Sequence, residues 1–194
     1  MPYAMARFAA RTALALGATM GLLAAAAAEI GRPNDDAWND YIYAADAFAI
    51  SAPVAPTLEK QNVRVAGGSV EAHVYTVPGV DNGAFMVFVV MRDASDQRSD
   101  REVLDEARIG ALRAANAIVI VQSNITLGRY RGSQIDLDTQ SGQPAGKSKR
   151  IRDRFFVVGR RLYQLMAVAP AGEPLPVGTG RWFDSFRLVG EGDR

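Results

Sequence analysis

The chain has 194 residues, of which 48% are hydrophobic and 22% are charged, a balance typical of one folded domain with an additional segment. It contains no cysteine, which excludes a disulfide framework, a thiolate metal site and a lipid-modified cysteine anchor. The formal net charge of +1 lacks the large basic excess of a general nucleic-acid-binding protein, so we expect no nucleic-acid partner.

The first 28 residues have the pattern of an export signal. Arg7 and Arg11 form a positive region, and the uncharged stretch Thr12–Ala28 is apolar and ends in small residues that suit cleavage. Extended to Ile30, the stretch is just long enough to cross a bilayer and remain as an anchor, although its alanines make it a weak membrane span. We expect residues 1–28 to be a signal peptide or signal anchor and residues 29–37 a linker. The protein is then periplasmic or held at the outer face of the inner membrane.

The next residues predict two strands and a hairpin. Residues 38–43 and 47–51 are expected to form two short strands. The Gly67-Gly68 pair suits a two-residue turn, because glycine tolerates positive φ. Folding the chain at this pair places Arg64 opposite Glu71 as an ion pair across the strands. The alternating residues of the hairpin then separate into an apolar face and a polar face.

A buried strand, a helix and another strand should follow. The valine-rich run Phe85–Met91 predicts a central strand that is covered on both faces. Ser99 and Glu102 have the Ser-x-x-Glu spacing of a capping box, which predicts a helix from Asp100 to about Ala115 with one apolar side. Ile118–Val121 is apolar throughout, and we expect it to be a second buried strand.

The remaining chain predicts three strands and a terminal helix. Tyr130–Leu137 is expected to be a strand, and Asp138–Ser148 a polar loop. A second hairpin joins strands at Lys149–Val158 and Arg161–Ala169. Arg181–Leu188 should close the chain as a short helix that docks its aromatic rings on the sheet. This order predicts an α+β fold with a largely antiparallel sheet, one long helix and a short C-terminal helix.

Several of these segments together resemble a known family. They are Phe48–Pro53, the Gly67-Gly68 hairpin with Phe85–Val90, and Phe156–Leu165 with Trp182–Leu188. Over residues 38–188 the chain is similar to an exported bacterial family of the PsbP-like fold, named for the extrinsic PsbP subunit of photosystem II. The resemblance implies one PsbP-like α/β/α sandwich over residues 38–190. It also implies an accessory subunit, an assembly factor or a small-ligand module, but its apolar and turn-forming residues carry no functional residue to this chain.

A basic run is the strongest candidate for a binding site. Its residues are Lys149, Arg150, Arg152 and Arg154, joined by Arg129 and Arg131 if the preceding strand lies alongside. Because alternate residues of a strand share a face, the three arginines Arg150, Arg152 and Arg154 form a stripe. The stripe could bind an acidic protein partner, anionic lipid headgroups or a ligand phosphate. The alternative is a solvated strand face whose charges discourage edge-to-edge pairing.

The sequence contains no recognisable catalytic constellation. His73 is the only histidine and has no metal-ligand motif or nucleophile elbow near it, so we expect a surface histidine, no metal and no cofactor. Two or more ionisable groups converging on His73 in a cleft would favour an enzyme instead. The sequence thus predicts a non-catalytic accessory or binding domain, associated with a membrane-bound protein complex. The alternative is a soluble periplasmic carrier that holds a small ligand between the sheet and the Asp100–Ala115 helix.

Overall fold

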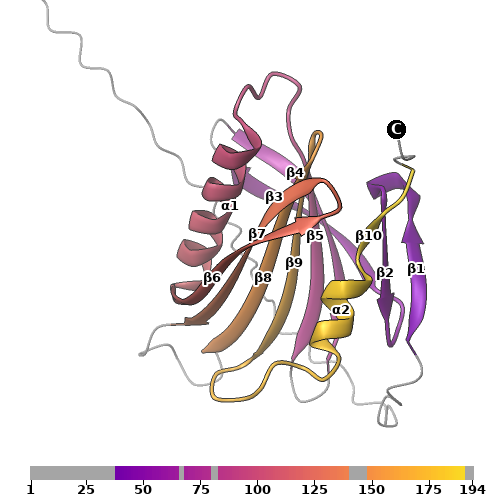
Figure 1. Cartoon of the computed structure of the whole chain (residues 1–194), viewed down its shortest axis with the longest axis vertical. Coiled ribbons are helices and arrows are strands. Elements are labelled where there is room, and N and C mark those ends of the chain that lie inside the picture. Colours follow the sequence, from indigo (N-terminus) through magenta and orange to yellow (C-terminus); the bar gives the residue numbers. More distant parts are fainter. Residues whose placement is uncertain (1–37, 66–67, 80–82, 140–147, 191–194) are drawn as a thin grey trace, which may run out of the picture.

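The computed structural model describes residues 38–65, 68–79, 83–139 and 148–190 (Figure 1). The expected export signal and linker, residues 1–37, lie outside these ranges, as do Gly67 and residues 140–147 of the expected loop. Within them the chain has the predicted α+β fold, with two α-helices and a largely antiparallel sheet. Neither of these two helices is long and apolar enough to cross a membrane.

The strands of the described residues form two antiparallel sheets (Figure 1). The smaller sheet has the order β1-β2-β10, with β1 (Asn39–Tyr43), β2 (Phe48–Ala52) and β10 (Arg187–Leu188). The seven-stranded sheet has the order β3-β4-β5-β9-β8-β7-β6. Its strands are β3 (Thr57–Val65), β4 (Gly68–Pro78), β5 (Ala84–Met91), β6 (Ala117–Leu127), β7 (Tyr130–Thr139), β8 (Lys149–Val158) and β9 (Arg161–Pro170). The helices are α1 (Asp100–Ala115), α2 (Thr179–Ser185) and the short 3-10 helix η1 (Ala44–Asp46).

Local sequence signals set both ends of α1. The backbone N–H of Glu102 donates to the Ser99 hydroxyl at 3.3 Å, and the backbone N–H of Ser99 donates to the Glu102 carboxylate at 2.8 Å. This reciprocal pair confirms the predicted capping box and the predicted start of the helix. At the other end Asn116 has a φ of 46°, a left-handed conformation that asparagine adopts more readily than most residues and that ends the helix.

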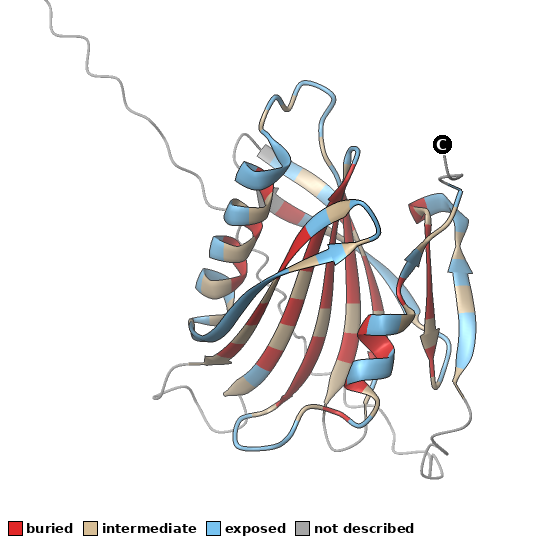
Figure 2. Cartoon of the chain, in the orientation of Figure 1, coloured by how far each residue is buried: buried red, intermediate tan, exposed pale blue. Residues whose placement is uncertain are grey.

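Both faces of the seven-stranded sheet are covered (Figure 1). On one face Val103, Ala107 and Ala111 of α1 pack against sheet residues such as Leu137 and Phe155. On the other face the small sheet and α2 cover a core rich in aromatic rings. β5 and β9 are therefore largely buried on both sides, as Figure 2 shows, and β5 is an inner strand of the sheet, as its valine-rich sequence predicted.

The first hairpin has a different register from the predicted one. Val65 pairs with Gly68, so Gly68 is a strand residue and not part of the turn. Ser69, and not Glu71, lies opposite Arg64. The observed register differs from the prediction by two residues, and an even offset leaves the alternation of the two faces unchanged. The hydrophobic pattern therefore predicted the faces correctly, but it could not distinguish registers that differ by two.

The strand predicted at Ile118–Val121 exists, but it is not buried. It is part of β6, which lies at one edge of the seven-stranded sheet and has β7 as its strand partner (Figure 2). The exposed fractions are 50% for Ile118, 39% for Val119, 55% for Ile120 and 49% for Val121. A β-bulge between Val119 and Val121 interrupts the pairing with β7. Apolar composition alone cannot distinguish a central strand from an edge strand, which is why the expectation of burial was wrong.

The C-terminal segment closes the aromatic core. Arg187–Leu188, which we expected to continue the helix, form β10 beside β2. The predicted docking of the aromatic rings is confirmed, since Trp182 stacks on Phe85 with ring centroids 5.1 Å apart. Phe186 lies just after α2 and stacks on Phe48 at 5.5 Å. These buried rings hold the C-terminus against both sheets.

Replacing Phe186 with alanine should lower the free energy of unfolding by about 3–5 kcal/mol, because a buried ring is replaced by a cavity. Urea unfolding followed by tryptophan fluorescence measures this loss. Val177→Ala is the control: Val177 is 68% exposed, and its change should stay within about 0.5 kcal/mol. Equal losses in the two variants would contradict the docking of Phe186.

Candidate functional site

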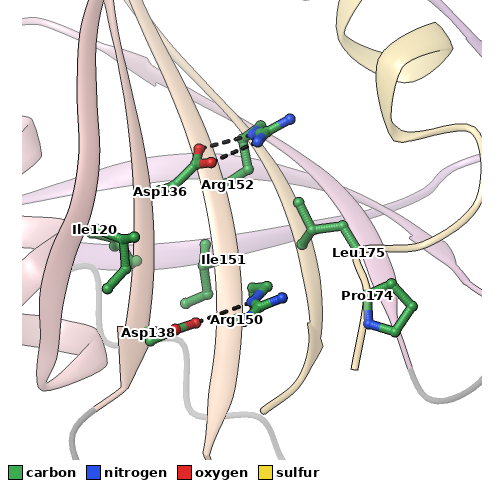
Figure 3. Close-up of a pocket in the computed structure, with 9 residues that line it drawn as sticks. Ile120, Asp136, Asp138, Arg150, Ile151, Arg152, Pro174 and Leu175 are labelled. Atoms are coloured by element: carbon green, nitrogen blue, oxygen red, sulfur yellow. Dashed lines mark hydrogen bonds and ion pairs between the residues drawn. The ribbon is translucent and has the colours of Figure 1, made fainter. Parts of the chain in front are cut away.

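The predicted basic stripe lies on β8 and faces the side of the sheet that carries α2. Each of its three arginines lies opposite a polar residue of β7: Arg150 opposite Asp138, Arg152 opposite Asp136 and Arg154 opposite Gln134. The two arginine–aspartate pairs lie side by side in Figure 3. Two of the three arginines therefore belong to a cross-strand ladder of opposite charges and the third faces a neutral amide, so the stripe is not a row of bare cations.

The three arginines differ in how they are held. Arg152 makes two bonds to Asp136, from Nε at 2.8 Å and from Nη2 at 2.6 Å, the two-pronged geometry that suits guanidinium and carboxylate. Arg154 donates to Gln134 at 2.8 Å and lies over the ring of Phe183. Arg150 contacts Asp138 through Nε alone, at 3.3 Å. Arg150 is thus the least constrained cation of the stripe.

The other basic candidates are not on the stripe. Lys149 alternates onto the opposite face, and its backbone N–H donates to the Thr139 hydroxyl at 2.7 Å. β7 does lie alongside β8, but Arg131 is out of phase with the residues that face the stripe. Arg129 is in the turn between β6 and β7, with its guanidinium 5.2 Å from the centre of the Tyr130 ring. The structure brings together only Arg150, Arg152 and Arg154.

A hollow of about 320 Å³ lies beside the ladder (Figure 3). Both arginine–aspartate pairs line it, together with Leu175 from the segment after β9 and Ile120 from β6. Its two guanidinium groups and two carboxylates cancel in charge. The hollow therefore joins the ladder to the edge of the sheet without concentrating charge of one sign.

His73 is not the isolated surface residue that the sequence predicted. Its Nδ1 lies 2.7 Å from Oδ2 of Asp46, and its Nε2 lies 3.2 Å from Oε1 of Glu71. The hydroxyl of Tyr75 donates to the same Asp46 oxygen at 2.5 Å. Lys60 donates to Glu71 at 3.0 Å and so takes the place that the predicted register gave to an arginine. Several ionisable groups thus converge on His73. No local signal in the sequence points to Asp46, because the fold brings it there from a distant turn.

This cluster is better suited to holding the fold together than to acid–base chemistry. Carboxylates occupy both ring nitrogens of His73, which leaves neither nitrogen to take a proton from a substrate. Burial is the main cause that raises the pKa of Tyr75, and the hydrogen bond to Asp46 is the second. The Tyr75 hydroxyl therefore stays protonated and remains a hydrogen-bond donor. The hydrogen bond from Lys60, followed by that from His73, lowers the pKa of Glu71. In the described ranges, no three His, Cys, Asp or Glu residues are placed to hold a metal ion.

One carboxyl group of the basic run lies in the core. Asp153 faces α1 between Ile151 and Phe155 and is fully buried. Its Oδ2 accepts a hydrogen bond from Gln164 at 3.2 Å, and its Oδ1 has no partner within the part of the chain that the structure describes. Burial raises the pKa of Asp153 to about 8, so the group is largely a neutral acid at pH 7.

The outer edge of β6 is the second candidate surface. The eleven residues of this strand include no charged residue and no proline. Between residues 83 and 139 and in the other described ranges, no backbone hydrogen bond reaches the outer side of β6. At the opposite edge of the sheet, β3 exposes the charged residues Glu59 and Lys60. Exposed edges are templates for another strand, and charge is a common way to block them, so of the two edges of the described seven-stranded sheet it is β6 that lacks this protection.

No protein-family model matches the chain, and no curated protein sequence matches it. The structure is similar to the solution structure of cyanobacterial PsbP from Synechocystis sp. PCC 6803, with 12% identity and a TM-score of 0.48 over 84% of this chain and 98% of that chain. It is also similar to a Pseudomonas aeruginosa protein of unknown function, with 10% identity and a TM-score of 0.38 over 61% of this chain and 85% of that chain. Both likenesses concern general architecture.

Removing the Asp46 carboxylate should destabilise the fold. In Asp46→Ala the buried hydroxyl of Tyr75 and the ring of His73 lose their acceptor, and bonds to a charged group contribute about 1.5–3 kcal/mol each. We expect the free energy of unfolding to fall by at least about 2 kcal/mol in urea unfolding. Asp40→Ala removes an exposed carboxylate and should cost less than about 1 kcal/mol. A loss for Asp46→Ala as small as that for Asp40→Ala would show that the hydrogen bonds to Asp46 do not hold the fold together.

Asp153 should make stability depend on pH. The folded protein keeps this proton up to about pH 8, while the unfolded chain releases it at about pH 4. The folded state therefore binds more protons between these values, and its stability falls with rising pH by at most about 1.4 kcal/mol per unit. Asp153→Asn cannot ionise and should lose less stability between pH 4 and 8, ending with the higher Tm at pH 8. Parallel Tm profiles for the two proteins would rule out this titration.

Proposed function

We propose that this chain is an exported, non-catalytic protein-binding domain that serves as an accessory subunit of a larger complex at the outer face of the inner membrane. The observation that carries the proposal is the uncharged outer edge of β6, with four exposed β-branched residues at Ile118–Val121. Main-chain groups along such an edge bind an added strand, and apolar side chains beside them strengthen the contact. A protein is the ligand that supplies both the main-chain groups of a strand and the apolar side chains.

The alternative functions have weaker support. The carrier hypothesis places a ligand between α1 and the sheet, but Val103, Ala107 and Phe155 are buried against one another there. The enzyme hypothesis requires ionisable groups that are free to react, and the groups around His73 are bonded to each other. Neither arrangement favours catalysis or small-ligand transport over protein binding.

The sequence supports the location. The positive and apolar residues 1–28 suit export, and if this segment stays attached it would hold the domain at the membrane surface. In this proposal the arginine stripe is a second contact, in which the Nη groups of Arg150 face an acidic side chain of the partner or an anionic lipid headgroup. Pairing with Asp138 and Asp136 makes this contact weaker than the predicted basic run suggested.

Native purification tests the proposal. The chain is tagged at its C-terminus, membranes are solubilised gently, and co-purifying proteins are identified and quantified. We expect a stoichiometric membrane complex, and we expect Ile120→Lys to reduce the amount of bound partner at least about tenfold, because a charge is placed in the uncharged binding edge.

Leu58→Lys is the matched control. Leu58 is 45% exposed on β3, so the same substitution is made on the edge that already carries charges, and the partner should be retained. A cleaved, monomeric protein with no partner would overturn the accessory role and favour the carrier. Loss of partner in both variants would show that β6 is not the binding edge.

A further inference from the structure

We infer that the strand bound at the β6 edge is β6 of a second copy of this chain, so that the protein forms a two-fold symmetric dimer with one sheet running through both copies. This inference rests on the proposed binding role of β6 and names the partner at that edge. It follows from the charge pattern of β6, from the position of its exposed apolar residues, and from the contrast with β3 at the other edge.

The absence of charge makes β6 compatible with itself. In a two-fold antiparallel pair, each strand meets the same segment of the other copy, so a charged residue near the axis would face its own like charge. None of the eleven residues from Ala117 to Leu127 is charged. A strand built to receive a charged partner segment would gain from a complementary charge, and β6 has none.

The exposed residues of β6 are self-complementary in shape and polarity. Ile118–Val121 are all β-branched, and β-branched side chains pack favourably across paired strands. An axis near Ile120 brings the two copies of this patch together and removes both from water. The bulge between Val119 and Val121 interrupts the β6–β7 ladder at this point, and Ile120 within it is the most exposed residue of the patch. We therefore place the contact of the two Ile120 side chains at the axis, with backbone pairing on either side of the bulge.

The opposite edge limits the assembly to two copies. Pairing β6 with β6 uses the same edge of each molecule and leaves β3 at both ends of the joined sheet. There Lys60 is ion-paired with Glu71 at 3.0 Å, and Glu59 is exposed beside it, so charge discourages the addition of another strand. In a two-fold β6–β6 contact both β6 edges are occupied, so no further copy can add there and the assembly is closed. A head-to-tail contact between β3 and β6 would instead produce fibres.

α1 holds the edge in position for this contact. Arg108 of α1 donates from Nη1 to the Gln122 side chain of β6 at 2.5 Å, immediately after the exposed patch. It also pairs with Asp105 at 3.2 Å, which fixes the guanidinium between helix and strand. The edge is thus supported from one side, while its outer side and the Ile118–Val121 patch remain accessible.

Sedimentation equilibrium of the purified protein over a wide concentration range tests the inference. We expect wild type and Leu58→Lys to reach twice the monomer mass, and Ile120→Lys to raise the dimer dissociation constant at least about tenfold by placing like charges across the axis. Circular dichroism and Tm report whether each variant is folded.

Mixing two variants of opposite charge at residue 120 tests the same contact in a second way, which still applies if one variant alone gives an ambiguous result. Ile120→Lys and Ile120→Glu should each be monomeric, and mixing them should restore dimers that contain one copy of each, because opposite charges then meet across the axis. Only a two-fold contact that places residue 120 near its own copy gives this rescue. Failure of the mixed proteins to associate would overturn the inference.

The outcomes separate this inference from the proposed function. A wild type that is monomeric at every concentration, while Ile120→Lys still abolishes capture of a different protein, overturns the dimer and leaves the accessory role standing. A dimer that Ile120→Lys dissociates, in a chain that captures no other protein, supports the inference and overturns the accessory role. A dimer that Ile120→Lys leaves intact places the self-contact elsewhere and overturns the inference.

Discussion

Asp46 is the point at which the two sheets are joined. Its carboxylate accepts hydrogen bonds from Tyr75 and His73 of β4, and its backbone oxygen accepts one from the Tyr163 hydroxyl of β9 at 2.7 Å. The donors belong to the seven-stranded sheet, while Asp46 lies in the turn between β1 and β2. These bonds therefore hold the small sheet over the aromatic core, and the second face of the large sheet stays buried only while the small sheet remains in place.

Once both faces are covered, the edges are where the large sheet can still offer main-chain groups to another molecule. The two edges are unlike in composition. β3 carries exposed charges, whereas β6 begins with an apolar run and continues with a mixture of uncharged polar and apolar residues. The binding role proposed for β6 therefore rests on the layered architecture, whereas the arginine ladder beside it is held by internal pairing with β7.

Local signals in the sequence predicted local structure well. Ser99 and Glu102 gave the start of α1, and the hydrophobic alternation gave the two faces of the first hairpin. The sequence pattern could not predict which residues from distant segments would become partners. The spacing of Arg150 and Arg152 matches that of Asp136 and Asp138, but only the register of β7 against β8 shows that each arginine has a carboxylate opposite. Similarly, nothing near His73 in the sequence points to Asp46, because the fold alone brings them together.

The exposure of the predicted strand at Ile118–Val121 is informative for the same reason. A run of isoleucine and valine was expected to be buried because apolar side chains gain most by leaving water. The fold exposes this run at an edge, where it also offers a free row of backbone groups. Both features favour association, and an uncovered edge of this kind would promote uncontrolled aggregation. In the proposed function a protein partner would cover these apolar residues, and the absence of charge on β6 is compatible with a second β6 as that partner.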